Sequence, residues 1–442
     1  MKTPLSRHFT FRKLFRFVLP SIGMMVFTSI YGVVDGFFVS NYVGSLPFAA
    51  INFILPFMMI LSAMGFMVGS GGTALVSYYL GSGDEKKANN IFSLLTYTVI
   101  IVGISFTGVG ILALKKVAVL LGATESLLPF CVQYGRIGLL SLAPFMLQNM
   151  FQSFMVAAGK PRLGFAITVI SGITNIVFDY LLVGVFHMGV AGAAIATALS
   201  ECVGGIVPLI YFLMPNKSLL HLGKVSFDGR SIMRSCINGS SEFVTSISGN
   251  IVSMLYNSQL IKYEGENGVS AYGVIMYVSS IFVAVFIGYS MGVAPIISYN
   301  HGAKNENELK SLLKKSLIII TVSELVMFLS GEALSVPLAE LYVGYDETLM
   351  KMTVTAFLIY SVSYLIAGIN IFASSFFTAL GNGRISAIIS FARTLFFQVV
   401  MVLLLPLLFG INGIWWAAAA AELMTAFVSV YYLVKMRGEY RY

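Results

Sequence analysis

Twelve long apolar runs constrain this chain more than any other feature of its sequence. A helix that crosses a membrane needs about 20 predominantly apolar residues. Such runs lie near residues 16–40, 47–79, 91–114, 127–157, 163–186, 189–214, 234–261, 269–299, 314–336, 350–380, 384–409 and 412–435. Hydrophobic residues make up 57% of the chain and charged residues only 10%, which excludes an ordinary soluble domain. We therefore expect an all-α polytopic membrane protein with twelve transmembrane helices.

The basic residues between the runs predict the orientation of the chain. If the N-terminus is cytoplasmic, 21 of the 27 Lys and Arg residues fall in cytoplasmic segments and 2 fall in spans. The remaining 4 lie in outer loops, and they are Lys115, Lys116, Lys262 and Lys351. This distribution follows the positive-inside rule. We predict a multi-pass protein of the plasma (inner) membrane with both termini cytoplasmic. The net charge of +8 then reports topology, so we expect the lipid bilayer and not nucleic acid as its partner.

The sequence also repeats itself at a nearly constant offset of 221 or 222 residues. The matching pairs are Ser77 and Ser298, Tyr78 and Tyr299, Gly81 and Gly302, Gly159 and Gly381, Arg162 and Arg384, Gly192 and Gly413, and Glu201 and Glu422. Matches in three separate regions indicate an internal duplication. Six spans in each half give both halves the same orientation, related by an axis along the membrane normal. We predict an N-terminal lobe over 1–214, a cytoplasmic connector over 215–230 and a C-terminal lobe over 231–442, with a central cleft.

Charged residues inside the spans are the candidates for function. At least five residues from the ends of the runs, six are acidic (Asp35, Asp179, Glu201, Glu242, Glu324 and Glu422) and two are basic (Arg136 and Arg393). Ionisable groups at membrane depth face a bundle interior or a water-filled cavity, where they pair or bind ions. An interior with an acidic excess favours cationic solutes or stores protons.

Asp35 and Asp179 stand apart from the other acids because the matching positions of the second half carry no acid. Asn175 precedes Asp179 by four residues and therefore shares its helix face. Tyr31 lies one turn before Asp35. We predict that at least one of the two carboxylates takes part in ion coupling. The alternative is that neighbouring amides and hydroxyls simply satisfy both.

The remaining acids are second candidates, for substrate binding. Glu201 and Glu422 lie midway along the last span of each half, where a helix–helix hydrogen bond or an Arg partner would explain them equally well. Glu242 lies near the start of the seventh span, where the helix dipole stabilises an acid. Pro20 either permits a bend in the first span or marks its start.

Four motifs give the chain a family resemblance over nearly its whole length. They are VDGFFV at 34–39 with Gly44 after it, GKPR at 159–162, NIVFD at 175–179 and GVAGAA at 189–194. With twelve spans, they resemble the multidrug and toxic compound extrusion (MATE) transporters. The resemblance implies two six-helix lobes around a V-shaped cleft, and export of drugs or organic cations by antiport against H⁺ or Na⁺.

The resemblance also implies roles for particular residues. Asp35 and Asp179 match first-lobe carboxylates of cation coupling and substrate release, with Na⁺ or H⁺ as the bound ion. The residues that accompany them are Asn175, Thr197 and Tyr31, and Pro20 matches a proline at which the first span bends. Two acids in the first lobe resemble the DinF-like branch. No confident match to the second-lobe Asp of other branches exists, unless Glu242 contributes.

Other readings of the sequence stay open at this point. A flippase for lipid-linked saccharides would keep the fold, and an ion-driven uptake carrier would need a different twelve-span fold. A receptor or scaffold is disfavoured by the short loops. An enzyme is disfavoured because no nucleophile–base pair or metal cluster is visible. We expect a bacterial transporter without a cofactor, acting as a monomer on small cationic substrates.

Overall fold

The computed structural model describes residues 4–442, and every regular element in that range is a helix. The first half contains α1 Phe11–Tyr42, α2 Ser45–Gly81, α3 Glu85–Leu120, α4 Leu128–Leu140, α5 Leu142–Ala157, α6 Pro161–Phe178, the π-helix η1 Asp179–Val185, and α7 Gly189–Leu213. The second half contains α8 Gly229–Asn238, α9 Ser240–Gly302, α10 Glu306–Val343, α11 Glu347–Ser361, α12 Tyr364–Ala379, α13 Gly383–Phe391, the π-helix η2 Ala392–Phe396, α14 Phe397–Phe409, α15 Ile411–Lys435 and α16 Arg437–Tyr440.

These helices confirm the twelve predicted spans. Nine helical segments of the described chain are long and apolar enough to cross a membrane by themselves. Two bent pairs, α4 with α5 (56°) and α11 with α12 (47°), each form one more span. The 63-residue α9 is two helices joined at Gly265, whose backbone is not helical (φ 62°, ψ −143°). The chain reverses there, so α9 contributes two spans.

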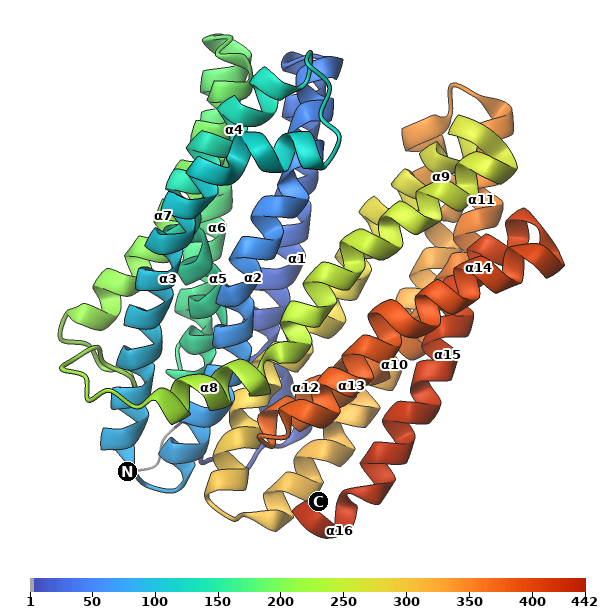
Figure 1. The fold of residues 1–442 in the computed structure, drawn as a ribbon. Coiled ribbons are helices and arrows are strands. Elements are labelled where there is room, and N and C mark those ends of the chain that lie inside the picture. The colour runs from blue at the N-terminus through green and yellow to red at the C-terminus, as the bar shows by residue number, and fades with distance from the viewer. Residues whose placement is uncertain (1–3) are drawn as a thin grey trace.

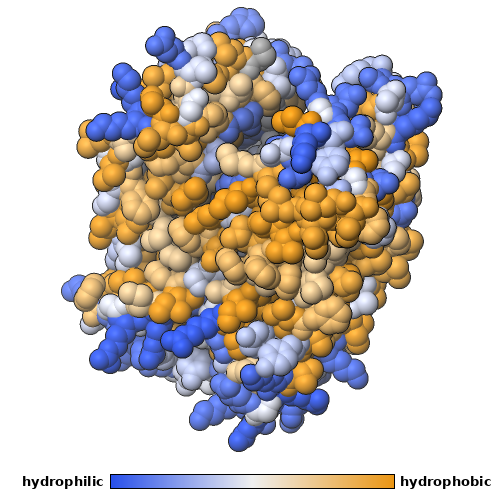
Figure 2. Space-filling model, turned by 45° about the vertical axis from the view of Figure 1, so that its right-hand side comes forward, coloured by the Kyte–Doolittle hydropathy of each residue, from blue (hydrophilic) through white to orange (hydrophobic). Residues whose placement is uncertain are grey.

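Two helix bundles make up the molecule. In Figure 1 they lie close together at the end that carries both termini and diverge toward the opposite end. One core of buried residues lies in the first bundle, and two lie mainly in the second. Figure 2 shows a broad apolar band around the molecule with hydrophilic residues above and below it, as expected for a protein that faces lipid on its flanks.

The repeated motif that ends α2 and α9 is the place where the two bundles cross. A Cβ atom built on Gly81 would lie 2.0 Å from the carbonyl oxygen of Tyr299. A Cβ on Gly302 would lie 2.0 Å from the carbonyl oxygen of Tyr78. Only glycine permits so close an approach of two backbones. The Ser-Tyr-x-x-Gly repeat therefore serves the contact between lobes near the termini.

The connector between the lobes lies against the start of α3. The backbone N–H of His221 donates to Asn89 Oδ1 (2.7 Å), and that of Ser226 donates to Asn90 Oδ1 (2.7 Å). Asp228 then caps α8. A hydrogen bond from the Ser231 hydroxyl, helped by backbone amides of the first turn, lowers the pKa of Asp228.

Candidate functional site

The structure brings Asp35 of α1 and Asp179 of α6 together inside the first lobe. Asp179 is fully buried, and its carboxylate neighbours that of Asp35. Within residues 4–442, neither Asp179 oxygen receives a hydrogen bond. The Asn175 Nδ2 group donates to Asp35 Oδ1 over 3.4 Å, which leaves Asn175 Oδ1 buried and also without a donor. Two adjacent carboxylates and an amide oxygen thus lie together, and both Asp179 oxygens and the Asn175 oxygen receive no hydrogen bond from residues 4–442.

The local backbone explains the position of Asp179. The α-helix α6 ends at Phe178, and the π-helix η1 begins at Asp179. The Asp179 N–H still bonds back to the carbonyls of Asn175 and Ile176. A π-turn widens the helix and changes which side chains share a face, and such turns are frequent at functional sites. Here the wider turn directs Asp179 inward.

Two tyrosines and a threonine close the space around the acid pair. The Tyr31 hydroxyl faces Gln148 of α5, and Asp35 and Glu201 are its charged neighbours. The Tyr134 hydroxyl of α4 faces Thr197 of α7. Because the Thr197 hydroxyl donates to the Ala193 carbonyl (3.0 Å), its oxygen remains an acceptor for Tyr134. The predicted coupling residues therefore form one cluster, at the junction of α1, α6 and α7.

Such a cluster can hold one small cation. Three buried acceptor atoms, both Asp179 oxygens and Asn175 Oδ1, lack a donor in the described part of the chain, and an unpaired buried acceptor is costly. A proton on one carboxyl group would supply the missing O–H donor to its neighbour. A Na⁺ ion would find hard oxygen ligands in the same atoms. The residues fit either ion, and both would remove the repulsion between the carboxylates.

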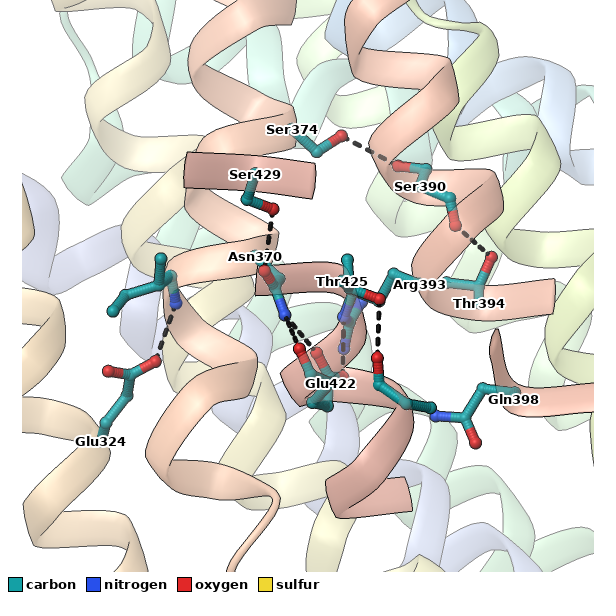
Figure 3. Close-up of polar contacts among 12 residues, drawn as sticks. Glu324, Asn370, Ser374, Ser390, Arg393, Thr394, Gln398, Glu422, Thr425 and Ser429 are labelled. Carbon is teal, nitrogen blue, oxygen red and sulfur yellow. Dashed lines mark hydrogen bonds and ion pairs between the residues drawn. The ribbon is translucent and has the colours of Figure 1, made fainter. Parts of the chain in front are cut away.

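Glu201 and Glu422, the acids that the repeat relates, are engaged by protein groups. The Ser141 hydroxyl donates to Glu201 Oε2 over 2.5 Å. Glu422 forms an ion pair with Arg393 Nε (2.9 Å) and accepts from Asn370 Nδ2 (2.8 Å). Figure 3 shows that these second-lobe side chains converge on Glu422 from separate helices. Both glutamates thus join helices within their own lobes.

In the second lobe, a neutral residue occupies the position that corresponds to Asp35. Asp35 corresponds to Tyr256 by the 221-residue offset. The Tyr256 hydroxyl donates to Gln398 Oε1 of α14 over 2.9 Å. A tyrosine–glutamine pair therefore joins the first and fifth spans of the second lobe, with Tyr256 at the position that corresponds to Asp35. It needs neither a proton nor a metal ion.

A cavity of about 280 Å³ lies between the lobes. It is lined by α1, α2 and α5 of the first lobe and by α9, α12, α13 and η2 of the second. Its charged lining residues are Glu242 and Arg393. Arg393 is already paired with Glu422, whereas the Glu242 carboxylate receives no hydrogen bond within residues 4–442. Glu242 is therefore the anionic group of this cavity that accepts no hydrogen bond from the described residues, with Arg393 as its charged neighbour.

The other intramembrane residues lie as follows. Glu324 is buried and accepts from the Ile369 backbone N–H (2.8 Å), as Figure 3 shows. Arg136 is exposed on α4, so it does not lie in the interior of its bundle, and the alternative of a water-filled cavity stays a prediction. Pro20 lies inside α1, which runs without interruption from Phe11 to Tyr42. The described part of the chain contains no group of three or more His, Cys, Asp or Glu residues that could hold a metal ion.

Sequence reasoning missed Tyr134 and Gln148 as neighbours of the site. Gln148 is buried on α5, where its Nε2 group donates to Ser171 Oγ (3.4 Å). Its signal was a cluster of three amides (Gln148, Asn149 and Gln152) inside an apolar run, which costs free energy unless the amides find partners. Tyr134 gave no comparable signal, since 22 tyrosines occur in the chain.

Comparisons with known proteins agree on one family. The MatE family model matches residues 20–181 and 243–433. The chain is similar to the multidrug export protein MepA of Staphylococcus haemolyticus, with 26% identity over 97% of this chain and 94% of the relative. The MepA protein of Staphylococcus saprophyticus is 27% identical over the same shares.

Solved structures share the fold. A MATE crystal structure in complex with MaL6 superimposes with a TM-score of 0.93 at 20% identity, covering 98% of both chains. An outward-facing multidrug resistance MATE transporter of the MOP superfamily gives a TM-score of 0.92 at 20% identity, over 98% of this chain and 97% of the other.

Proposed function

Because the chain belongs to the MatE family of membrane transporters, we propose that it exports drugs and organic cations in exchange for H⁺ or Na⁺. It is a multi-pass transporter of the bacterial kind and not an enzyme. The observation that carries the coupling proposal is the adjacent pair of Asp35 and Asp179, in which both buried Asp179 oxygens lack a donor among residues 4–442. The multidrug cargo follows from the MepA relatives.

The coupling cation loads at the acid pair from the end of the molecule where the lobes diverge. We assign that end to the outside, because the positive-inside rule then places both termini in the cytoplasm. Loading removes the repulsion between Asp35 and Asp179 and gives the Asp179 oxygens the partner that they lack among residues 4–442. A proton is the simpler occupant, because two adjacent carboxyl groups can share one without further ligands. Both acids in the first lobe support the DinF-like assignment.

The helix α1 links the coupling site to the contact between lobes. It carries Asp35 and packs against α6 in its own lobe and α9 in the other. Its Ser29 hydroxyl donates to the Ser280 carbonyl of α9 over 3.2 Å. A shift of α1 on cation loading would therefore change the contact between lobes. Coupling is then a difference in affinity between two conformations, to which cation and substrate bind unequally.

The cavity between the lobes receives the substrate. The Glu242 carboxylate lies in its wall without a hydrogen-bond donor from the described residues, beside serine and threonine hydroxyls and apolar side chains. This lining suits an organic cation, which offers one positive charge and a large apolar surface. Each lobe buries its own core, so a monomer suffices for this function.

Ethidium efflux from bacterial cells expressing the chain tests the proposal. We expect gradient-driven efflux to fall at least tenfold in Asp35→Asn and in Asp179→Asn at equal membrane abundance. Glu266→Gln, an exposed acid beside the α9 reversal, is the matched control and should export normally. Collapse of wild-type efflux with a protonophore would identify H⁺, and collapse on Na⁺ removal would identify Na⁺.

Two results would contradict the proposal. If both Asn variants kept full gradient-driven efflux, the acid pair would not couple transport. If the wild type exported no drug above the empty vector, the cargo would be of another kind, such as a lipid-linked saccharide carried by a flippase of the same superfamily.

A further inference from the structure

We propose that a cationic cavity at the terminal end of the first lobe binds the headgroup of an anionic phospholipid. The cavity has a volume of about 740 Å³. It lies between the N-terminal segment that precedes α1, the first turns of α1, and the α5–α6 connection at 159–163. This site is separate from the acid pair and from the cavity between the lobes.

The charge of the lining indicates an anion. Five lining residues are cationic, and no Asp or Glu occurs among those that the structure describes; the five are Arg7, Lys13, Arg16, Lys160 and Arg162. Not one of their side chains forms a hydrogen bond or an ion pair with another described residue. Five unpaired cations repel one another, so a phosphate group between them would relieve that repulsion and accept several hydrogen bonds.

The start of α6 adds free backbone donors to the same wall. This 18-residue helix begins at Pro161, and Lys160 at its N-cap makes no side-chain cap. By the repeat, Lys160 corresponds to Asn382, whose side chain caps α13 by accepting from the Ile385 N–H (3.2 Å). The first lobe therefore has a cation where the second has a built-in cap. An external phosphate can take the place of that cap, since helix N-termini bind anions.

The surroundings favour a phospholipid over a free phosphate. Phe11, Phe15 and Leu19 recur at four-residue spacing on α1 and are 46%, 47% and 49% exposed. They form an apolar stripe beside the basic residues of the same helix, as at a bilayer interface. Phe17 and Tyr211 line the cavity itself and offer contacts to acyl chains. Basic pockets at such interfaces suit anionic headgroups.

A headgroup bound here would lie beside the contacts that residues 8 and 9 make with α10 of the second lobe. The Phe9 backbone N–H donates to Glu308 Oε1 of α10 (2.9 Å), and His8 Nδ1 lies 2.6 Å from Glu308 Oε2. On the other side, Pro4 packs against Gly159. The lipid would therefore stabilise the N-terminal segment in the position that joins α10 to the first lobe.

The first test measures lipid retention by the full-length protein in detergent. Native mass spectrometry would compare phosphatidylglycerol with phosphatidylcholine of the same acyl chains. We expect preferential retention of phosphatidylglycerol, and a loss of affinity of about fivefold in Arg16→Gln and again in Arg162→Gln, which corresponds to about 1 kcal/mol for each cation. Arg12→Gln, an exposed cation of the same helix outside the cavity, is the control and should retain the lipid.

The second test uses Lys160→Asn, which copies the cap of the second lobe. We expect this variant to unfold at a higher temperature than the wild type without lipid, and to gain less from added phosphatidylglycerol. Equal retention of both lipids by the wild type would overturn the proposal, as would equal losses in Arg12→Gln and Arg16→Gln. Stabilisation by inorganic phosphate or glycerol phosphate equal to that by phosphatidylglycerol would overturn the lipid assignment in favour of a free anion.

Discussion

The glycine crossing between α2 and α9 should control which end of the transporter is open. In Gly302→Ala the new Cβ would lie 2.0 Å from the Tyr78 carbonyl oxygen, whereas ordinary contacts begin at 3.4 Å. The two backbones must therefore separate by about 1.4 Å or distort. Gly81→Ala produces the same conflict with Tyr299. Overpacking of this kind costs about 1–3 kcal/mol for each site.

The cost applies only to conformations in which the lobes touch at the terminal end. A penalty of about 2 kcal/mol would shift the balance toward a conformation that opens this end by about 30-fold, since 1.4 kcal/mol corresponds to a factor of ten. The double variant Gly81→Ala, Gly302→Ala should shift it further. Efflux should fall in both, because alternation needs both conformations.

Distances between spin labels can measure that shift. Lys86→Cys and Lys310→Cys place labels on exposed positions of the two lobes near the crossing, in a background without the native cysteines Cys131, Cys202 and Cys236. We expect a longer-distance population in the glycine variants. Gly108→Ala, on α3 with open space around its Cβ, is the control and should match the parent. A double variant with the parent's distance distribution and thermal stability would refute the reasoning.

Three further predictions concern polar groups within the lobes. Arg393→Ala leaves Glu422 buried without its cation and should lower the free energy of unfolding by about 3 kcal/mol. The double variant Arg393→Met, Glu422→Gln should recover part of this loss. Thermal unfolding measures the stability of both variants, and no recovery would contradict the pairing. Glu242→Gln should weaken ethidium binding about tenfold but leave a neutral substrate unaffected, as fluorescence titration would show; equal losses would speak against a charge contact. Gln398→Leu should lower the free energy of unfolding by about 1 kcal/mol and keep cation-coupled efflux. Asn175→Leu should impair cation-coupled efflux. Similar coupling defects in both variants would contradict the proposal that only the first lobe couples transport to a cation.

Much of the fold could be predicted because each span must satisfy its own backbone inside the membrane. That constraint makes apolar length a direct signal, and all twelve spans follow from it. The bends could not be predicted in the same way. The break at Ser141 between α4 and α5 lies inside an apolar run, and the π-helix at Asp179 changes no composition. Both depend on how neighbouring helices pack.

The candidate site could be predicted in part, for a related reason. The spacing of Asn175 and Asp179 predicts a shared helix face, because it depends on one helix alone. The approach of Asp35 depends on how α1 packs against α6, which no local pattern encodes. Gln148 reaches the site only through the bent span of α4 and α5. Contacts between spans therefore had to come from the structure, or from the family resemblance.

If the acid pair couples transport as proposed, a comparison of the two lobes explains why coupling would lie in the first one. In the second lobe, Arg393 neutralises Glu422, and Tyr256 pairs with Gln398. These groups complete one another whatever the conditions outside, so they bind the helices together permanently. In the first lobe, both Asp179 oxygens lack a donor among the described residues, and a bound proton or Na⁺ would supply their partner. On the proposed mechanism, the acid pair changes its free energy when it takes up a cation, which the Tyr256–Gln398 and Arg393–Glu422 contacts do not require.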